Sequence, residues 1–201
     1  MEIFNDLIQS SAEWHQARCG VITASEFSKV LAKGDGLTRK GLLYRKAAER
    51  ITGNIEPSYS NKSMEEGKKK EPRARELYIE HSGNQVVECG FIKNGNIGYS
   101  PDGLIGEDGL IEIKSPEANQ HIETLLSDKV PIGHKPQIQG GLYVSGRKYL
   151  DYVSFCPGMP IFIKRVERDE EYIMTLGAEL LTFELDLQQL VEKITNKFYK
   201  F

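Results

Sequence analysis

Apolar side chains recur every three or four positions along most of the first 83 residues, which is the spacing of amphipathic helices. Ser11, Thr23 and Thr38 are suited to cap helices at their N-terminal ends, and glycines follow where these helices should stop. We therefore predict helices over residues 11–18, 23–33, 38–52 and 61–81. Pro72 should kink the last of these helices or begin it afresh, because proline lacks the N–H that a helix interior needs.

Short apolar runs follow between residues 84 and 167, bounded by the turn sequences Asn-Gly-Asn, Pro-Asp-Gly and Glu-Asp-Gly, which is typical of strands. The predicted strands cover residues 85–92, 97–99, 109–114, 149–156 and 160–167, and further helices cover residues 117–127, 135–144 and 169–198. This order of elements predicts an α/β protein in which helices flank both sides of a central mixed sheet of mainly antiparallel strands.

The size of the chain adds a domain count to this picture. A chain of 201 residues, 39% of them hydrophobic, can form one domain with a substantial core. We expect a mainly helical N-terminal part over residues 1–83, a sheet core over residues 84–167 and a C-terminal helix over residues 168–201. No apolar run reaches the length of about 18 residues that a membrane span needs, so no membrane association is expected.

The N-terminus and the cysteines predict a cytoplasmic protein. The first sixteen residues lack the basic start and the apolar stretch of a signal peptide. Cys19, Cys89 and Cys156 are odd in number, far apart and without CxxC spacing, so we expect reduced thiols and no zinc site.

The net charge of −3 does not exclude a nucleic acid partner, because an acidic site and a basic groove cancel in the sum. Basic residues concentrate in two segments, residues 39–46 and 68–75. Each segment is typical either of a solvated helix face or of a surface that binds phosphates.

The segment SPDGLIGEDGLIEIKSP, residues 100–116, carries the strongest chemical signal. Side chains alternate along a strand, so Glu112 and Lys114 project from one face about 6.5 Å apart. A hairpin would bring Asp102, in the preceding Pro-Asp-Gly turn, alongside them. Carboxylate and carbonyl oxygens are the ligands that Mg²⁺ prefers, and Asp102, Glu112 and the carbonyl of Ile113 would supply three of them.

Such a cluster is suited to metal-assisted cleavage of a phosphodiester, because the cation polarises the phosphate and Lys114 can orient or deprotonate the attacking water. An isolated Glu-x-Lys is more often an exposed ion pair on an amphipathic strand. The preceding Pro-Asp favours the catalytic interpretation, because Pro-Asp-x₉-Glu-x-Lys resembles the signature of the PD-(D/E)XK nuclease superfamily.

Two helical motifs could add to this site. Glu71 lies among basic residues and is either a further metal or water ligand or simply the i,i+4 partner of Arg75. Gln139 and Tyr143 share a helix face, and Gln139 is either a hydrogen-bond donor to phosphate or water or an ordinary surface amide. Gly140 and Gly141 in mid-helix indicate close packing of that helix on the sheet or on a ligand.

A further motif, WHQARCGVITAS over residues 14–25, gathers Trp14, Arg18, Thr23 and Ser25. A guanidinium, hydroxyls and the N–H groups of a helix N-terminus can together bind a phosphate. The alternative is that Trp14 belongs to the core, Arg18 to the surface, and Thr23 or Ser25 caps a helix.

In this order and spacing the motifs resemble those of the lambda-type phage recombination exonucleases, the YqaJ group of the PD-(D/E)XK superfamily. The matching patterns are W-H-x-x-R-x-G-x-I-T-A-S, G-x-x-x-E-x-x-A-R, S-P-D-G, E-I-K and Q-x-Q, and they span about residues 14–145. The resemblance implies a restriction-endonuclease-like core. It also implies a Mg²⁺-dependent exonuclease, with Mn²⁺ as a substitute, that degrades the 5′-ended strand of linear double-stranded DNA processively.

The resemblance implies a role for each matching residue. Asp102, Glu112, the Ile113 carbonyl and Glu71 match metal ligands, Lys114 matches the catalytic lysine, and Gln139 matches a glutamine beside the attacking water. Arg18, Ser25 and Ser100 match a pocket for the 5′ phosphate, and Met64 matches an apolar wedge that separates the strands. It further implies a phage or prophage protein that forms a homotrimeric ring and works with a single-strand annealing protein.

Two other functions stay open on the residues alone. One is a different nuclease of the same superfamily, either an endonuclease or a single-strand trimming enzyme. The other is a non-catalytic DNA-binding module, which the intact Asp102, Glu112 and Lys114 disfavour.

Overall fold

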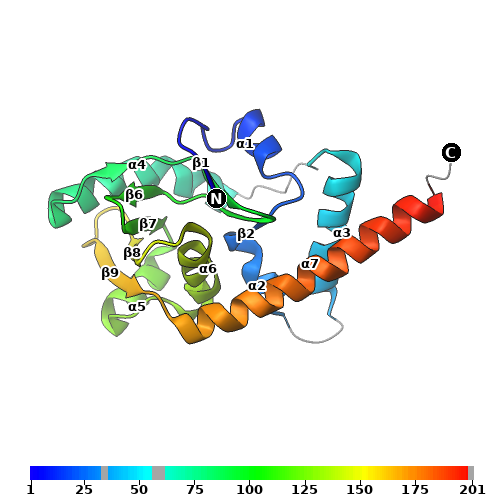
Figure 1. Cartoon of the computed structure of the whole chain (residues 1–201). Coiled ribbons are helices and arrows are strands. Elements are labelled where there is room, and N and C mark those ends of the chain that lie inside the picture. The colour runs from blue at the N-terminus through cyan, green and yellow to red at the C-terminus, as the bar shows by residue number, and fades with distance from the viewer. Residues whose placement is uncertain (33–35, 56–61, 199–201) are drawn as a thin grey trace.

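The structure is a computed structural model that describes residues 1–32, 36–55 and 62–198, with side chains of residues 62–64 left undescribed. In the described part, the α-helices are α1 (Ala12–Ala17), α2 (Phe27–Val30), α3 (Leu37–Thr52), α4 (Lys62–Ser82), α5 (Ala118–Ser127), α6 (Lys135–Ser145) and α7 (Glu170–Phe198). Two 3₁₀ turns, η1 (Ala24–Glu26) and η2 (Ile132–His134), precede α2 and α6. Figure 1 shows α7 running as one long rod along the molecule and past the end of α3.

The predicted α/β class with a mixed sheet flanked by helices is confirmed, and the strands form two such sheets. One sheet has the order β1 (Glu2–Phe4), β4 (Phe91–Asn94), β5 (Ile97–Tyr99) and β2 (Ile22–Thr23). The other has the order β3 (Val86–Val87), β6 (Gly103–Ile105), β7 (Gly109–Lys114), β8 (Tyr149–Ser154) and β9 (Phe162–Glu167). Both are mixed, since β2 pairs parallel with β5 and β7 parallel with β8. The N-terminal part also supplies strands β1 and β2, so it is not only helical.

The run 85–92, predicted as one strand, is split between the two sheets. The break falls next to Gly90, where a Cβ atom would lie 2.0 Å from the carbonyl oxygen of Leu7. The chain can pass the N-terminal loop this closely only with glycine at this position. Strand β6 was missed because it is three residues long and directly follows the Pro-Asp-Gly turn.

The predicted helices are confirmed, with their ends shifted by a few residues at most wherever they are described. Ser11 caps α1 by accepting a hydrogen bond from the N–H of Trp14. Helix α4 continues through Pro72 as one helix. The predicted start of α4 at residue 61 lies outside the described residues. The second predicted helix ends earlier than expected, because α2 stops at Val30.

The five-stranded sheet has a different core on each face. Ile111 and Ile113 of β7 pack with Ala74 and Tyr78 of α4 on one face. Leu110, on the opposite face, packs in the larger core that includes α6 and α7. Because side chains alternate along β7, Glu112 and Lys114 point to this second face. The strand therefore presents its polar side chains toward α6 while its backbone edge reaches the site.

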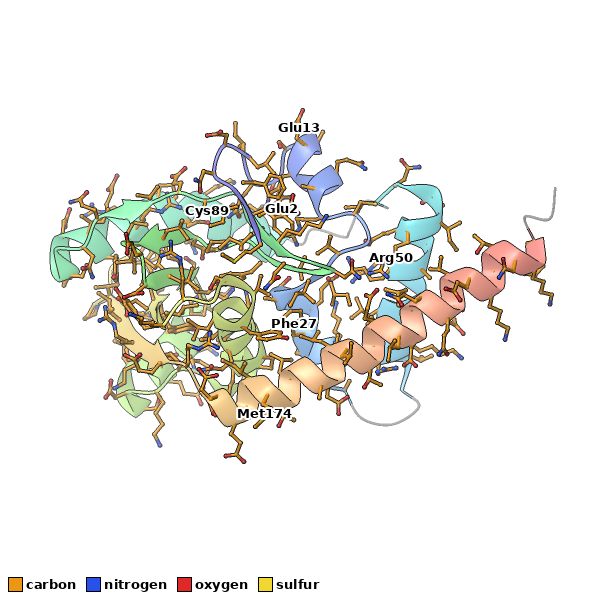
Figure 2. The ribbon with its side chains drawn as sticks, viewed as in Figure 1. Glu2, Glu13, Phe27, Arg50, Cys89 and Met174 are labelled. Atoms are coloured by element: carbon orange, nitrogen blue, oxygen red, sulfur yellow. The ribbon has the colours of Figure 1, made fainter. Side chains whose placement is uncertain are left out.

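The two mid-helix glycines of α6 confirm the predicted close packing. A Cβ at Gly140 would lie 2.3 Å from the ring of Phe27, which Figure 2 labels, and one at Gly141 would lie 2.8 Å from the ring of Tyr99. In the described part of the chain, no helix combines the length and the apolar character of a membrane span. Cys19, Cys89 and Cys156 are free thiols.

Candidate active site

The β6–β7 hairpin brings Asp102 against β7. The N–H of Asp102 donates to the carbonyl of Ile111 at 3.2 Å, and the N–H of Ile113 donates to Oδ2 of Asp102 at 2.6 Å. Strand β6 begins only at Gly103, so the Asp102 side chain takes the place of a strand partner opposite Ile113.

The same geometry sets the direction of the Ile113 carbonyl. The N–H and C=O groups of one strand residue point to the same edge of the strand. Since the N–H of Ile113 faces Asp102, its carbonyl faces Asp102 as well. The Asp102 carboxylate and the Ile113 carbonyl thus lie on one edge of β7, as the predicted ligand set requires.

Glu112 is almost completely buried and held by three donors. Its side chain accepts hydrogen bonds from the Tyr99 hydroxyl at 2.5 Å, from Nζ of Lys114 at 2.6 Å and from Nε2 of Gln137 at 2.5 Å. Nζ of Lys114 also lies 3.3 Å from Oε1 of Gln137. These bonds fix the rotamers of Glu112 and Lys114 without any ligand.

Glu71 approaches from α4, on the other side of the hairpin. The structure confirms the pairing of Glu71 with Arg75, and its role as a metal or water ligand stays a prediction. Glu71 accepts a hydrogen bond from Arg75 at 2.5 Å, and it also lines the same cavity as Asp102, Ile113 and Lys114. The cavity has a volume of about 690 Å³, and the N-terminal loop, residues 5–10, forms its other wall. We call Glu71, Asp102, Glu112 and Lys114 the carboxylate cluster.

The carboxylate cluster is short of positive charge. Burial raises the pKa of Asp102 well above its usual range, and the nearby charges of Glu112 and Glu71 raise it further. Burial also raises the pKa of Glu71, although Arg75 opposes this shift. Burial acts to lower the pKa of Lys114, but Glu112 and Asp102 outweigh burial and raise it. Lys114 and Arg75, which is shared with exposed Glu88, do not balance three acids.

This charge deficit and the donor set fit a divalent cation such as Mg²⁺, which prefers carboxylate and carbonyl oxygens. Among the described residues, no three acidic, histidine or cysteine side chains stand preassembled around a common point. The reason is visible in the hydrogen bonds, since the oxygens of Asp102 and Glu112 are turned toward protein donors. The residues fit the ion in chemistry, and a cation would compete with these donors.

The structure does not bring Gln139 to the carboxylate cluster. Gln139 is buried, and its amide donates to the carbonyl of Glu167 at 2.9 Å and accepts from the N–H of Asp169 at 2.9 Å. It therefore joins α6 to the junction of β9 and α7. Gln137 is the glutamine that bonds Glu112.

The packing of α6 on Tyr99 explains why Gln137 and not Gln139 reaches Glu112. Residues four apart share a helix face, so Gln137 lies on the same face as Gly141. Gly141 is the residue that lets α6 approach Tyr99, the hydrogen-bond partner of Glu112. The glutamine one turn before the close-packed glycine was the one facing the sheet.

A second polar group lies at the other end of the Ser100–Pro101–Asp102 loop. The Arg18 guanidinium stacks on the Trp14 ring at 3.8 Å and donates to the Ser100 hydroxyl at 2.9 Å. Nε1 of Trp14 donates to the same hydroxyl at 3.0 Å. Since the Ser100 oxygen accepts two hydrogen bonds, its own hydrogen is free to donate elsewhere. We call Trp14, Arg18 and Ser100 the Arg18 pocket.

Arg18 forms no ion pair in the part of the chain that the structure describes. Burial lowers the pKa of Arg18 to about 10, while Glu26 and Glu49 act in the opposite direction. Both acids are engaged by Lys46, and Glu26 also by Arg45, in a buried network on α3. Arg18 is thus a partly buried cation without a carboxylate of its own among the described residues.

No described contact joins the two remaining predicted residues to the site. Ser25 is exposed, and its hydroxyl lies 3.2 Å from that of Thr23, with no bond to Arg18 or Ser100 among the described contacts. Met64 belongs to the first turn of α4, and its side chain is outside the described residues.

Comparison with known proteins matches residues 13–148 to the YqaJ-like viral recombinase domain. The chain is 34% identical to an alkaline exonuclease (LHK-Exo) from Laribacter hongkongensis, with a TM-score of 0.87, and the match covers 94% of this chain and 99% of that one. LHK-Exo in complex with dAMP matches at 35% identity with the same TM-score and coverage.

A phage-related exonuclease from Haemophilus somnus 129PT shares the fold at 16% identity and a TM-score of 0.69, over 87% of this chain and 96% of that one. Comparison with curated proteins gave no match. The matched segment contains the carboxylate cluster, the Arg18 pocket and Gln137. From its matched domain and its fold, the chain belongs to the YqaJ-like viral recombinase domain family.

Proposed function

We propose that this protein is a Mg²⁺-dependent exonuclease that degrades the 5′-ended strand of linear double-stranded DNA and leaves a 3′ single strand. Membership of a family of phage-type exonucleases supports nuclease activity. The metal is inferred from the chemistry of the site. The polarity and the duplex substrate rest on the resemblance to the family, and the Arg18 pocket supports the polarity.

One observation carries the proposal. Ser100 of the Arg18 pocket and Asp102 of the carboxylate cluster are two residues apart in one loop, so at most about 7 Å of chain separates their Cα atoms. A partly buried cation with a free hydroxyl donor suits a terminal phosphate, and a cation-poor group of acids suits a metal that acts on the neighbouring phosphodiester. An enzyme that binds the end beside its catalytic group removes nucleotides from that end.

Asp102, Glu112, the Ile113 carbonyl and Glu71 would hold Mg²⁺, and Mn²⁺ prefers similar ligands. The ion would polarise the scissile phosphate and lower the pKa of the water that attacks it. Tyr99 and Gln137 orient Glu112 through its two carboxylate oxygens. Hydrogen bonds of this kind commonly tune metal sites as strongly as the ligands.

Lys114 performs the proton chemistry with Gln137 as its positioning partner. In the charged form favoured by the neighbouring acids, Lys114 offsets the charge that develops on the phosphate oxygens. A bound divalent cation would repel this ammonium, lower its pKa and allow Lys114 to take a proton from the attacking water. The water oxygen forms a bond to phosphorus, the bond to the 3′ oxygen breaks, and that oxygen takes up a proton.

Breakage of this bond gives a 5′-mononucleotide and leaves a 5′ phosphate on the shortened strand. The new end has the same charge as the one just removed, so the Arg18 pocket can bind it in the next round. The complex of LHK-Exo with dAMP supports a mononucleotide product. Phosphate contacts carry no base information, so we expect cleavage with little sequence preference.

The assembly and partners are also part of the proposal. A homotrimeric ring would keep the enzyme on one duplex and would account for processive digestion in a phage-infected or prophage-carrying bacterial cytoplasm. The single-strand annealing protein would bind the 3′ strand. These points depend on the family relationship alone.

The test is digestion of a linear duplex labelled on one strand at either its 5′ or its 3′ end. With Mg²⁺ and a 5′-phosphorylated end, the 5′ label should be released first, as a mononucleotide. EDTA should stop the reaction, and closed circular DNA should resist it. Release of the 3′ label first would exclude the proposed polarity. Cleavage of the circular DNA would favour the alternative of an endonuclease.

A further inference from the structure

The C-terminal helix α7 carries none of the residues assigned to the site, yet Arg50 and Asn96 link its Glu184 to the segment that follows Arg18. We propose that Glu184 of α7, acting through Arg50 and Asn96, is a positioning residue that fixes Arg18 for the terminal phosphate. This inference rests on the proposed function, because it assumes that the Arg18 pocket binds that phosphate.

Glu184 and Arg50 form a two-pronged ion pair between α7 and α3. Both terminal nitrogens of Arg50 donate to the Glu184 carboxylate at 2.7 Å, and the two side chains are 19% and 12% exposed. Figure 2 shows Arg50 beside α3, on the side where α7 passes. Planar, bidentate pairs of this kind restrict orientation more than a single contact does.

The remaining donor of Arg50 reaches the backbone next to Arg18. Nε of Arg50 donates to the carbonyl of Gly20 at 3.0 Å. The N–H of Gly20 donates to Oε2 of Glu49 at 2.9 Å, so α3 holds this peptide from both sides. Gly20 has a φ of +69°, and a Cβ there would lie 2.7 Å from Cγ of Arg50. Glycine is therefore required for the contact.

A second path runs from Glu184 to the other end of this segment. Nδ2 of Asn96 donates to Oε1 of Glu184 at 2.9 Å, and the carbonyl of Asn96 accepts the N–H of Ile22 at 3.0 Å. Through Arg50 and Asn96, Glu184 therefore anchors the chain at Gly20 and at Ile22, two and four residues after Arg18. A shift of this turn would move the guanidinium away from Ser100, to which it is bonded at 2.9 Å.

The chain offers a matched control. Arg39 and Asp186 form another ion pair between α3 and α7, at 2.8 Å, and no described hydrogen bond or ion pair joins either residue to the segment from Arg18 to Ile22. If Glu184 served only to attach α7 to α3, both pairs would contribute to stability and neither would affect recognition of the DNA end.

The experiment compares Glu184→Gln, Arg50→Lys and Asp186→Asn on duplexes with 5′-phosphate or 5′-hydroxyl ends, measuring KM and kcat for each. Lysine keeps the charge of Arg50 but cannot bond both Gly20 and the carboxylate. We expect Glu184→Gln and Arg50→Lys to raise KM about tenfold on 5′-phosphate ends alone, which corresponds to ~1.4 kcal/mol of binding. The kcat at saturating DNA should stay unchanged in both variants. Asp186→Asn should keep the KM and kcat of the wild-type protein.

The inference is overturned if Glu184→Gln and Asp186→Asn change the preference for phosphate equally, or if neither changes it. Asn96→Ala, which removes an exposed amide, replaces Glu184→Gln if that variant does not fold, and an unchanged preference in Asn96→Ala and Arg50→Lys overturns the inference as well. Arg18→Gln separates the two levels of the argument. If Arg18→Gln keeps the preference, the proposed pocket itself fails. If Arg18→Gln abolishes the preference and Glu184→Gln does not, only the role of α7 fails.

Discussion

The carboxylate cluster and the Arg18 pocket adjoin the same three-residue loop, yet their charge balance is opposite. In the carboxylate cluster, three acids face Lys114 and an Arg75 that is shared with exposed Glu88, and the pKa of Asp102 is raised. In the Arg18 pocket, a partly buried guanidinium donates to a hydroxyl and stacks on an aromatic ring. The first region therefore favours a cation and the second an anion.

This contrast explains why one loop can organise a reaction at a DNA end. Buried charges are costly unless a partner compensates them, so each region gains when its missing partner binds. A terminal phosphate and a divalent cation are the two partners that a nuclease acting on an end requires. Each prediction below tests one side of this comparison while a control leaves the other side intact.

The largest effect is expected for Lys114→Met. Removal of a charge that stabilises a transition state typically lowers kcat by about 10²–10³-fold. The preference of binding for 5′-phosphate ends should stay unchanged, because the Arg18 pocket does not include Lys114. Steady-state rates and binding of labelled duplex ends measure both quantities. The control is Lys148→Met, an exposed lysine that also pairs with an acid. Near-normal activity in Lys114→Met would contradict the catalytic role proposed for this lysine.

The next effect separates two glutamines that are two residues apart. Gln137→Ala should lower kcat by roughly 10–100-fold, the usual cost of losing a partner that orients a metal ligand. Gln139→Ala should leave kcat near normal and lower the free energy of unfolding by about 1–3 kcal/mol, because two partly buried backbone groups lose their hydrogen-bond partner. Turnover and chemical denaturation of both variants test this pair. The reverse pattern would contradict the orientation of α6, in which Gln137 and not Gln139 faces Glu112.

The sequence predicted the part of the site that lies within one hairpin. Asp102, Glu112 and Lys114 follow from a turn signal and an alternation of period two, and the structure brings them together. Gln137 could not be chosen over Gln139 by periodicity alone, because both orientations of α6 satisfy the pattern and only its packing on Tyr99 decides. The division into two sheets was missed since β1, β2 and β3 have two or three residues each, too few for a periodic signal.

The sequence indicated the Arg18 pocket only in part, because its residues lie far apart along the chain. Arg18 and Ser100 are 82 residues apart in sequence, and their contact depends on Trp14, whose indole bonds both Gly90 and Ser100. The roles of Arg50, Asn96 and Glu184 depend on contacts between α3, α7 and the four-stranded sheet. No local pattern in the sequence indicates them.

A smaller effect is expected from Gly141→Ala. The added methyl would lie 2.8 Å from the Tyr99 ring and push it from Glu112. Overpacking of this kind costs about 1–3 kcal/mol of stability, and we expect kcat to fall with it. Gly41→Ala is the control, because Gly41 is also inside a helix but has no atom within 4 Å of the added Cβ. Thermal unfolding and turnover should distinguish the two variants. Equal behaviour would show that Tyr99 does not depend on this contact.

The most direct test of the charge comparison is the binding of Mn²⁺ to the protein without DNA, followed by electron paramagnetic resonance. We expect wild-type protein and Arg18→Gln to bind the ion alike. Asp102→Asn should weaken binding by about tenfold or more, since a ligand oxygen loses its charge. Equal Mn²⁺ affinity in wild-type protein and Asp102→Asn would contradict the assignment of the carboxylate cluster as the metal site.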